Sequence, residues 1–380
     1  MTLWRRPSLV VLDLRPLQCG YANRGIGRCT RELAPRLAAL LERPVTRFVG
    51  KAPKVRYQVF SLVLNGKENP FPNIPVLISD PAWKRPWIWD QVCLPFLLLR
   101  HRVAFLQNFV AMGPLPQISF PALFRSRGIA EIHDWHMFSE NAVDLERFYR
   151  NTFRIRIQKK MLPKIRNIFV HSEQVRLDSI RHGVPAEKII LAPLGSDHFD
   201  KVTAEPWLPE NFVLSIGDAP NKNLSFTLGI LETLRSRFLH LNWIIVGDRN
   251  RVKEQLSLTN VDLPAWITVL VAPTDGLLKS CYQKALALVF PSSQEGFGIP
   301  LLEAMRLGCP ILTTDIEPMK SILDPVPGLL PLEKPESWCK SLTELLRNPQ
   351  IRKAAIEAGR KKSDDYTWDK TTECLFKVYP

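Results

Sequence analysis

The sequence is poor in the features that mark membrane-spanning and secreted proteins. None of its apolar runs approaches the roughly 18 residues that a membrane-spanning helix needs, and residues 1–7 do not have the shape of a signal peptide. The seven cysteines are scattered, their number is odd, and no C-x-x-C pair occurs. This distribution argues against a disulfide framework or a zinc site and indicates reduced thiols in the cytoplasm.

The sequence also lacks internal repeats and low-complexity tracts, and its composition is that of a globular protein. Of its 380 residues, 46% are hydrophobic and 23% are charged. This length suffices for two domains of ordinary size, each with a core of its own.

Negative charge is scarce in the first half of the chain only. Residues 1–200 hold 30 Lys and Arg against 16 Asp and Glu, whereas residues 201–380 hold 21 of each, so the net charge of +14 belongs to the N-terminal half. A basic face attracts acidic lipid headgroups, pyrophosphate-linked acceptors or nucleic acid. Nucleic acid is the poorer choice, because no binding motif for it accompanies the charge. A plain solvated basic face stays an alternative.

A dinucleotide fingerprint is missing, although two glycines precede a helix-forming stretch. Gly25 and Gly27 are expected in a loop ahead of a helix over residues 30–40, but Thr30 stands where the third glycine of the fingerprint belongs. Ten residues also separate Gly25 from Leu14, the end of the first expected strand, which is too many for the tight turn of such a site. A glycine loop before a helix can still receive phosphate. The sequence likewise has no Asp-x-Asp pair that would indicate a metal site.

Short apolar stretches alternate with helical stretches along the chain. Such alternation is typical of parallel sheets with helices on both faces. We therefore expect an α/β protein with two doubly wound parallel-sheet (Rossmann-like) domains that face each other across a cleft. Prolines at residues 203–211 indicate a linker, so residues 1–202 would form the N-terminal domain and residues 212–365 the C-terminal domain.

Residues 285–315 are the most informative stretch, because they combine two expected strands with a glycine loop and a helix. The apolar run at residues 287–290 predicts a buried strand, and after the Glu295-Gly-Phe-Gly loop a helix runs to Gly308. Open α/β sheets bind ligands at such corners, and the helix N-terminus favours negative charge. Glu295 and Glu303 could each accept hydrogen bonds from hydroxyl groups of one elongated ligand. On the residues alone, an ordinary exposed acid at Glu303 is an equally good interpretation.

This stretch resembles the Glu-x7-Glu motif of the family 4 retaining nucleotide-sugar glycosyltransferases, which have the GT-B fold. The likeness extends from the PSSQEGFGIP loop to the LLEAMRLGCPIL helix and strand. The resemblance implies that Glu295 contacts hydroxyl groups of the transferred sugar and that Glu303 holds the ribose. It also implies that the backbone of Gly296, Phe297 and Gly298 lies beside the sugar and the phosphate.

Further positions match motifs of the same family. Lys222 matches the Lys-Asn pair that binds the donor phosphate, and Gly25 and Gly27 match the R-G-I-G loop that closes over the diphosphate. His133 and Asp134 match a His-Asp pair that faces the reacting sugar. On the residues alone, a histidine at a strand end is more often structural.

The resemblance covers nearly the whole chain and is weakest over residues 40–125 and 316–335. Asp218 and Asn221 stand where the family frequently has arginines. The diphosphate would therefore be bound mainly by Lys222 and the glycine loops. In GT-B relatives the last helix, here within residues 366–380, crosses back to the first domain.

The resemblance implies a hexosyltransferase of bacterial polysaccharide or lipopolysaccharide synthesis. It would move a sugar, with mannose as the preferred guess, from GDP-mannose or a UDP- or dTDP-sugar to a hydroxyl of a glycolipid or growing polysaccharide. No cofactor and no metal are expected. A GT-B nucleotide-sugar epimerase and a catalytically inactive assembly subunit of a glycan-synthesis complex stay open as alternatives. The failed fingerprint disfavours a dinucleotide-linked oxidoreductase.

Two segments of the N-terminal half are candidates for contact with a membrane. Three tryptophans lie within the seven residues from Trp83 to Trp89 beside two basic residues, and the apolar residues 95–99 follow. Such a cluster is more often packed in a core. A basic amphipathic stretch over residues 145–165 carries an excess of positive charge. We therefore expect a cytoplasmic protein, with peripheral contact to an anionic cytoplasmic membrane face as a further hypothesis.

Overall fold

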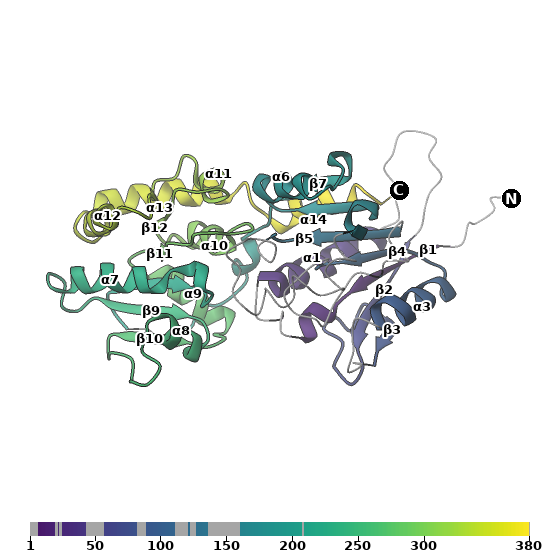
Figure 1. Ribbon diagram of the computed structural model, residues 1–380, viewed down its shortest axis with the longest axis horizontal. Coiled ribbons are helices and arrows are strands. Elements are labelled where there is room, and N and C mark those ends of the chain that lie inside the picture. The colour runs from purple at the N-terminus through teal and green to yellow at the C-terminus, as the bar shows by residue number, and fades with distance from the viewer. Residues whose placement is uncertain are drawn as a thin grey trace. The chain divides into compact units, whose positions relative to one another are not determined.

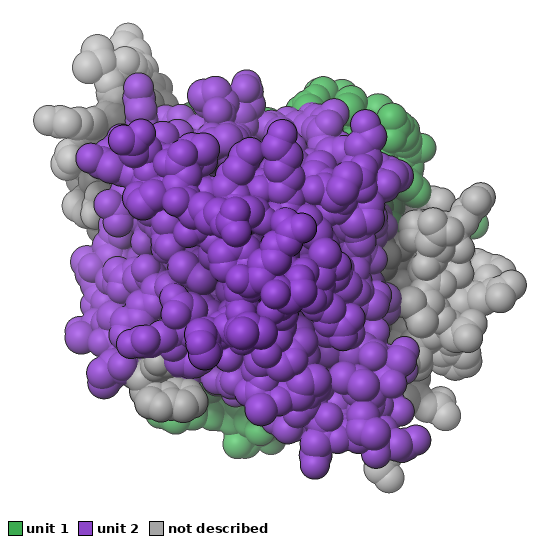
Figure 2. Space-filling view, turned by 90° about the vertical axis from the view of Figure 1, so that its left-hand side faces the viewer, with its two compact units in different colours: residues 1–194, 368–380 green, residues 195–367 purple. Residues whose placement is uncertain are grey.

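The computed structural model describes residues 7–19, 22, 25–42, 57–81, 89–110, 121, 127–135, 160–206 and 209–379. The chain divides into two compact units: unit 1 comprises residues 1–194 and 368–380, and unit 2 comprises residues 195–367. Figure 2 colours the two units separately. The division falls a few residues before the expected boundary at residue 202 and assigns the last helix to unit 1.

Both membrane candidates from the sequence lie partly outside the described residues. Trp83, its two basic neighbours and residues 145–159 are among the positions left out. Trp89 is described and lies buried in the core of unit 1, as the packing interpretation predicts. In the described part of the chain, no helix combines the length and the apolar character needed to cross a bilayer.

Unit 1 is built on a seven-stranded sheet in the order β3-β2-β1-β4-β5-β6-β7, in which all neighbouring strands are parallel. The strands are β1 (Ser8–Asp13), β2 (Tyr57–Leu64), β3 (Val76–Asp80), β4 (Val103–Asn108), β5 (Gly128–Ile132), β6 (Asn167–Val170) and β7 (Ile189–Leu191). The helices are α1 (Gly25–Glu42), α3 (Leu94–Arg100), α6 (Glu173–Arg181) and α14 (Trp368–Phe376) (Figure 1). The strand order reverses between β1 and β4, and doubly wound sheets bind ligands at the carboxyl ends of strands beside such a switch point.

Helix α1 begins earlier than the sequence predicts. Gly25 and Gly27 form its first turn instead of a loop ahead of residue 30. The buried face of the helix continues back through Thr30 to Gly27, and the Thr30 hydroxyl donates a hydrogen bond to the Ile26 carbonyl at 3.0 Å. The predicted start of the helix at residue 30 is therefore wrong. Burial of the first turn of α1 in unit 1 outweighs the low helix propensity of glycine.

A buried cluster of charges joins three elements of unit 1. The guanidinium of Arg15 forms ion pairs with Asp13 at 2.8 Å, Asp80 at 2.8 Å and Asp90 at 2.6 Å. It also lies 5.6 Å from the centre of the Trp89 ring. Burial alone would lower the pKa of Arg15, but the three carboxylates more than offset it and hold that pKa well above its ordinary value. One cation thus fastens β1, β3 and the π-helical turn η2 (Trp89–Cys93) to each other.

Unit 2 repeats this architecture with a six-stranded parallel sheet in the order β10-β9-β8-β11-β12-β13. The strands are β8 (Phe212–Ile216), β9 (Asn242–Val246), β10 (Ile267–Leu270), β11 (Leu288–Phe290), β12 (Ile311–Thr314) and β13 (Leu329–Leu330). The helices are α7 (Leu224–Arg235), α8 (Arg249–Gln255), α9 (Asp275–Lys284), α10 (Ile299–Leu307), α11 (Met319–Leu323), α12 (Pro335–Arg347) and α13 (Pro349–Ser363). Its switch point lies between β8 and β11. The prediction of two doubly wound parallel sheets is confirmed.

One layer of the core of unit 2 shows how the helices cover the sheet. Alternate strand residues such as Val213, Trp243 and Val289 point to one face and pack against Leu231 of α7 and Trp338 of α12. The strands are buried on both faces, which explains why they appear in the sequence as short continuous apolar runs. The carboxyl ends of β8 and β11 are therefore held by a rigid core.

Candidate functional site

Two loops of unit 2 meet at the carboxyl ends of β8 and β11. Residues 217–223 follow β8, and residues 291–298 connect β11 to α10. The side-chain amide of Asn221 donates a hydrogen bond to the carbonyl of Gln294 at 2.7 Å, and the Asn221 carbonyl accepts one from the Ser293 amide at 2.9 Å. Asn221, which differs from the arginine frequent in the family, thus fastens the two loops together.

Lys222 and Glu295 extend from these two loops and contact each other. Lys222 Nζ forms an ion pair with Glu295 Oε1 and lies 4.6 Å from the centre of the Phe290 ring. The hydroxyl of Ser292 donates to the same carboxylate oxygen at 2.7 Å. The side chains of Lys222 and Glu295 are only 16% and 13% exposed. Lys222 therefore points toward the glutamate, and its positive charge is balanced locally.

The Gly296–Phe297–Gly298 segment leads directly into helix α10. Gly298 has a φ of 102°, in the left-handed region that favours glycine, and precedes the first residue of the helix. Pro300 lies in the first turn, where its missing N–H is not needed. Phe297 is buried, and its ring meets that of Tyr366 edge-on at 6.3 Å. Glu295 thus lies four residues before the first residue of α10, and a helix N-terminus favours an anion through its free amides and its dipole.

Glu303 lies in the second turn of α10 and is buried, so the interpretation as an ordinary exposed acid is wrong. Its Oε2 accepts a hydrogen bond from the hydroxyl of Tyr282 at 2.7 Å, and its Oε1 lies 3.1 Å from Nε2 of His198. Tyr282 belongs to α9, and His198 to the 3-10 turn η7 (Asp197–Phe199). Burial and the nearby Glu303 carboxylate raise the pKa of Tyr282 well above its ordinary value, so the phenol stays a donor. Each carboxylate oxygen retains acceptor capacity for a ligand hydroxyl.

Asp218, the other departure from the family pattern, also supports a loop. Its Oδ2 accepts a hydrogen bond from the amide of Asp248 at 2.6 Å, and Asp248 caps the N-terminus of α8. Arg251 of α8 lies 3.7 Å from Asp218 Oδ1. The carboxylate therefore joins the loops that follow β8 and β9, and it places an arginine side chain beside the loop of Lys222.

In unit 1, His133 follows β5, and a backbone carbonyl holds its ring. His133 Nε2 carries the proton and donates it to the carbonyl of Phe109, which follows β4, at 2.8 Å. Ile26, between Gly25 and Gly27, packs on Val110, the next residue along the chain. The first turn of α1 is thus linked to the strand end that holds the histidine.

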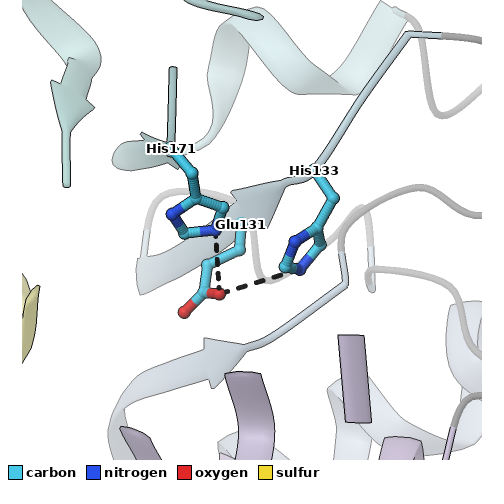
Figure 3. A group of neighbouring side chains, drawn as sticks. All are labelled: Glu131, His133 and His171. Atoms are coloured by element: carbon cyan, nitrogen blue, oxygen red, sulfur yellow. Dashed lines mark ion pairs between the residues drawn. The ribbon is translucent and has the colours of Figure 1, made fainter. Parts of the chain in front are cut away.

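Glu131 and His171 lie next to His133 and complete a buried polar cluster (Figure 3). Glu131 Oε2 is 3.8 Å from His133 Nε2 and 3.6 Å from His171 Nε2, and the two rings are 4.9 Å apart. His171 Nδ1 donates to the carbonyl of Ala192 at 2.8 Å, and Glu131 Oε1 accepts from Gln107 at 3.2 Å. His, Cys, Asp and Glu are the side chains that commonly bind metals. Among the described residues, these three are the one such group whose possible ligand atoms all lie within 4.8 Å of one another.

Burial decides the charge of this cluster. It raises the pKa of Glu131 to about 8 and lowers the pKa of His171 to about 4. Burial also lowers the pKa of His133, with a contribution of the same sign from His171, against an opposite contribution from Glu131. At neutral pH the carboxyl group is therefore mostly protonated and both rings are neutral. Asp134, which follows His133, is exposed.

The sequence-predicted residues gather within each unit. In unit 2, Lys222, Glu295 and the glycine loop surround the switch point, with Glu303 one helical turn further on. In unit 1, the first turn of α1 and the His133–Asp134 pair belong to segments that follow β1 and β5. The roles of these residues in binding stay predictions.

Sequence reasoning missed four side chains that the structure places in these clusters: His171, His198, Tyr282 and Glu131. A histidine in a turn and a tyrosine within a helix have no spacing signal. Glu131 has a different signal in the sequence: it lies in an apolar strand, and an acid is rarely buried there without a specific partner.

Two parallel doubly wound sheets with polar loops at their switch points are the architecture of the GT-B class, and solved structures agree. The chain is similar to the sucrose-phosphate synthase of Thermosynechococcus elongatus, with a TM-score of 0.73, 15% identity and coverage of 98% of both chains. It is also similar to Anabaena Alr3699/HepE in complex with UDP and glucose, with a TM-score of 0.68, 16% identity and coverage of 98% of this chain and 99% of that one. These similarities concern the fold alone, and they confirm the predicted GT-B fold.

Residues 202–362, most of unit 2, match the family model of the Glycosyl transferases group 1. The O-antigen chain mannosyltransferase RfbU of Salmonella typhimurium is 26% identical over 283 residues, which cover 73% of this chain and 76% of that protein. The phosphatidyl-myo-inositol mannosyltransferase of Mycolicibacterium smegmatis is 27% identical over 174 residues, and the match spans only 44% of its length. The predicted resemblance to nucleotide-sugar glycosyltransferases of GT-B fold and the predicted enzyme class, a hexosyltransferase that depends on a nucleotide sugar, are confirmed. The narrower assignment to family 4 stays a prediction.

Proposed function

We propose that the protein is a retaining glycosyltransferase that moves a hexose, with mannose preferred, from a nucleoside-diphosphate sugar to a hydroxyl of a glycolipid or growing polysaccharide. One observation supports this most: at the switch point of unit 2, Lys222 and Glu295 contact each other beside the N-terminus of α10. A cation, a carboxylate and a positive helix end in one place match a ligand that carries a diphosphate and sugar hydroxyls side by side.

In this proposal the donor separates the ion pair of unit 2 and contacts both partners. The diphosphate takes the Lys222 ammonium and the amides of α10, and a sugar hydroxyl takes the Glu295 carboxylate. Ser292 keeps the carboxylate in place through its 2.7 Å hydrogen bond. Glu303, oriented by its own two partners, accepts hydrogen bonds from the ribose. The ion pair therefore holds both side chains ready before the donor arrives, which lowers the cost of ordering them.

The proposed reaction breaks the bond between the sugar C1 and the phosphate oxygen and forms a bond from C1 to the acceptor oxygen on the same face. The acceptor hydroxyl gives its proton to the departing diphosphate. Sugar transfer passes through an oxocarbenium-like centre. Positive potential from Lys222 and the helix N-terminus stabilises the charge on the leaving group. Neutral His133 orients the sugar, and the proposal needs neither a cofactor nor a metal.

The acceptor is proposed from the nature of the relatives and from charge. Two of the relatives are an O-antigen chain mannosyltransferase and a phosphatidyl-myo-inositol mannosyltransferase. A phosphatidyl-myo-inositol acceptor carries a lipid and a phosphate group, and the surplus of Lys and Arg in the first 200 residues would attract such a group. The proposal therefore includes peripheral contact with an anionic membrane face on the cytoplasmic side.

A panel of nucleotide sugars tests the proposal. Thermal shift identifies the donor that binds, and transfer to lipid-linked acceptors is then followed by NMR of the anomeric proton of the product. The expected product has the anomeric configuration of the donor. Conversion of the donor without an acceptor would instead support the epimerase, and binding without any turnover would support an inactive subunit.

A further inference from the structure

The helical segment formed by η2 and α3 lacks a polar outer face. Its inner face belongs to the core of unit 1 through Trp89, Leu94 and Leu98. Val92, Phe96 and Leu99 are on the outer side and are 62%, 64% and 54% exposed. Their separations of four and three residues place them along one side of a helix. We call these three side chains the α3 stripe.

Surface helices normally turn charged or polar residues toward water. Among the described residues, six large hydrophobic side chains are more than half exposed, and the α3 stripe accounts for three of them. The others, Leu239, Val261 and Val271, occur in separate loops of unit 2. Single exposed apolar residues are ordinary, but a row of them marks a surface that is covered by something else.

The charge around the stripe indicates what covers it. The helix ends at the exposed Arg100, and the exposed residues His101 and Arg102 follow it. Unit 1 as a whole contains 32 Lys and Arg against 16 Asp and Glu, whereas unit 2 contains 19 against 21. A row of apolar side chains that ends in cations fits the boundary between anionic headgroups and acyl chains of a bilayer.

A second copy of the chain fits the stripe less well. Two copies would bring together units that each have an excess of 16 positive charges. Three side chains also cover far less than the roughly 800 Å² per partner of a standard protein interface. Figure 1 shows α3 in unit 1, where it packs against β4.

We propose that the α3 stripe inserts into the surface of an anionic membrane, while Arg100 and Arg102 contact lipid phosphates. This inference names a surface for the membrane contact that belongs to the proposed function. It depends on neither the donor nor catalysis, so it can fail or hold by itself.

The experiment measures binding of the whole protein to vesicles without donor or acceptor. Vesicles of phosphatidylcholine alone and of phosphatidylcholine with phosphatidylglycerol are compared by co-sedimentation. The test variant carries Phe96→Ser and Leu99→Ser, and the matched control carries Leu239→Ser and Val261→Ser, which remove apolar side chains of unit 2 that are also more than half exposed. Circular dichroism and thermal unfolding verify that both variants remain folded.

The wild type and the control are expected to bind the anionic vesicles and to leave the neutral ones in solution. The test variant is expected to bind at least about tenfold more weakly, because two partly inserted side chains are lost. A third variant with Arg100→Gln and Arg102→Gln is expected to bind more weakly at low salt and to differ less from the wild type at high salt.

Two results would overturn the inference. Equal binding of the test variant and the wild type would assign the membrane contact to other residues. The second result is that the wild type does not bind vesicles but self-associates as its concentration rises, and that the test variant does not. That result would make the stripe a protein interface. Turnover of a soluble acceptor by the test variant separates either result from a failure of the proposed function.

Discussion

The hydroxyl of Tyr282 donates a hydrogen bond to Glu303 Oε2 at 2.7 Å, and this contact joins two helices of unit 2 at a buried carboxylate. His198 Nε2 lies 3.1 Å from the other oxygen. With both oxygens engaged, the carboxylate has one orientation, and the acceptor capacity that remains is fixed in space. A carboxylate held in this way suits the recognition of neighbouring hydroxyl groups, such as those of a ribose.

The substitution Tyr282→Phe should weaken binding of the nucleotide sugar. It removes one donor from the Glu303 carboxylate and leaves the ring in place. We expect KM for the donor to rise about tenfold, which corresponds to one lost hydrogen bond to a charged group. The value of kcat should change little, because the ribose is bound equally in the ground and transition states.

Steady-state kinetics with a ribose donor and its 2′-deoxy analogue test this expectation. The variant should discriminate less between the two donors than the wild type does. Tyr366→Phe is the matched control, because that ring packs on Phe297. An unchanged KM and unchanged discrimination in Tyr282→Phe would show that the tyrosine has no part in donor binding.

The substitution Lys222→Met should reduce catalysis far more than the same change at Lys253. The ammonium contacts Glu295 at the switch point and would stabilise the charge of the leaving diphosphate. We expect kcat/KM to fall by roughly two to three orders of magnitude. Lys253→Met on α8 is the control, since that lysine lies 3.9 Å from the exposed Asp262. Similar rates in the two variants would argue against a phosphate at Lys222.

The buried Arg15 predicts a large effect on stability. Arg15→Met leaves the carboxylates of Asp13, Asp80 and Asp90 buried without their cation. We expect the free energy of unfolding to fall by about 3–5 kcal/mol in urea titrations. Arg176→Met, which removes a surface pair with Glu173, should change it little. Equal small effects would show that the cluster is more hydrated than its burial indicates.

The pH dependence of stability should report on Glu131. Burial raises its pKa in the folded protein to about 8 from an ordinary value of 4.5, so folding favours the protonated acid. The stability that this group contributes is complete below about pH 4.5 and is lost as the pH rises through 8. Glu131→Gln keeps the shape and removes the titration, so its unfolding free energy should fall less between pH 5 and pH 8.

Urea unfolding at several pH values measures this difference, and His171→Gln provides the opposite case. The pKa of His171 is lowered by burial to about 4 from 6.5, so its contribution is present above pH 6.5 and is lost as the pH falls through 4. The His171 variant should therefore lose less stability on acidification than the wild type. Parallel pH profiles for the wild type and the Glu131 variant would mean that the carboxyl group is ionised in the folded protein.

The sequence predicts the elements well wherever local signals determine them. β11 (Leu288–Phe290) lies within the apolar run predicted at residues 287–290, because a short buried apolar run is a local signal. Ser172 caps α6 by accepting a hydrogen bond from Val175 at 3.2 Å, and Gly308 ends α10 with a φ of 75°. Such caps depend on neighbouring residues only.

The parts of the site that depend on distant residues could not be predicted. Tyr282 and His198 are 21 and 105 residues away from Glu303, and only the fold brings them to it. The glycines at the start of α1 were a similar case, since burial of Gly27 extends the helix against its local propensity. Motif spacing identified Glu303, but not the side chains that orient it.

The most direct test of the proposed sugar site is turnover by Glu295→Gln with a donor that the wild type uses. The control is Glu357→Gln, which changes an exposed glutamate of α13 in the same unit. The account predicts that the Glu295 variant loses at least about a hundredfold in kcat/KM, because a charged contact to the reacting sugar is gone, while the control is unaffected. Undiminished turnover in the Glu295 variant would contradict the account.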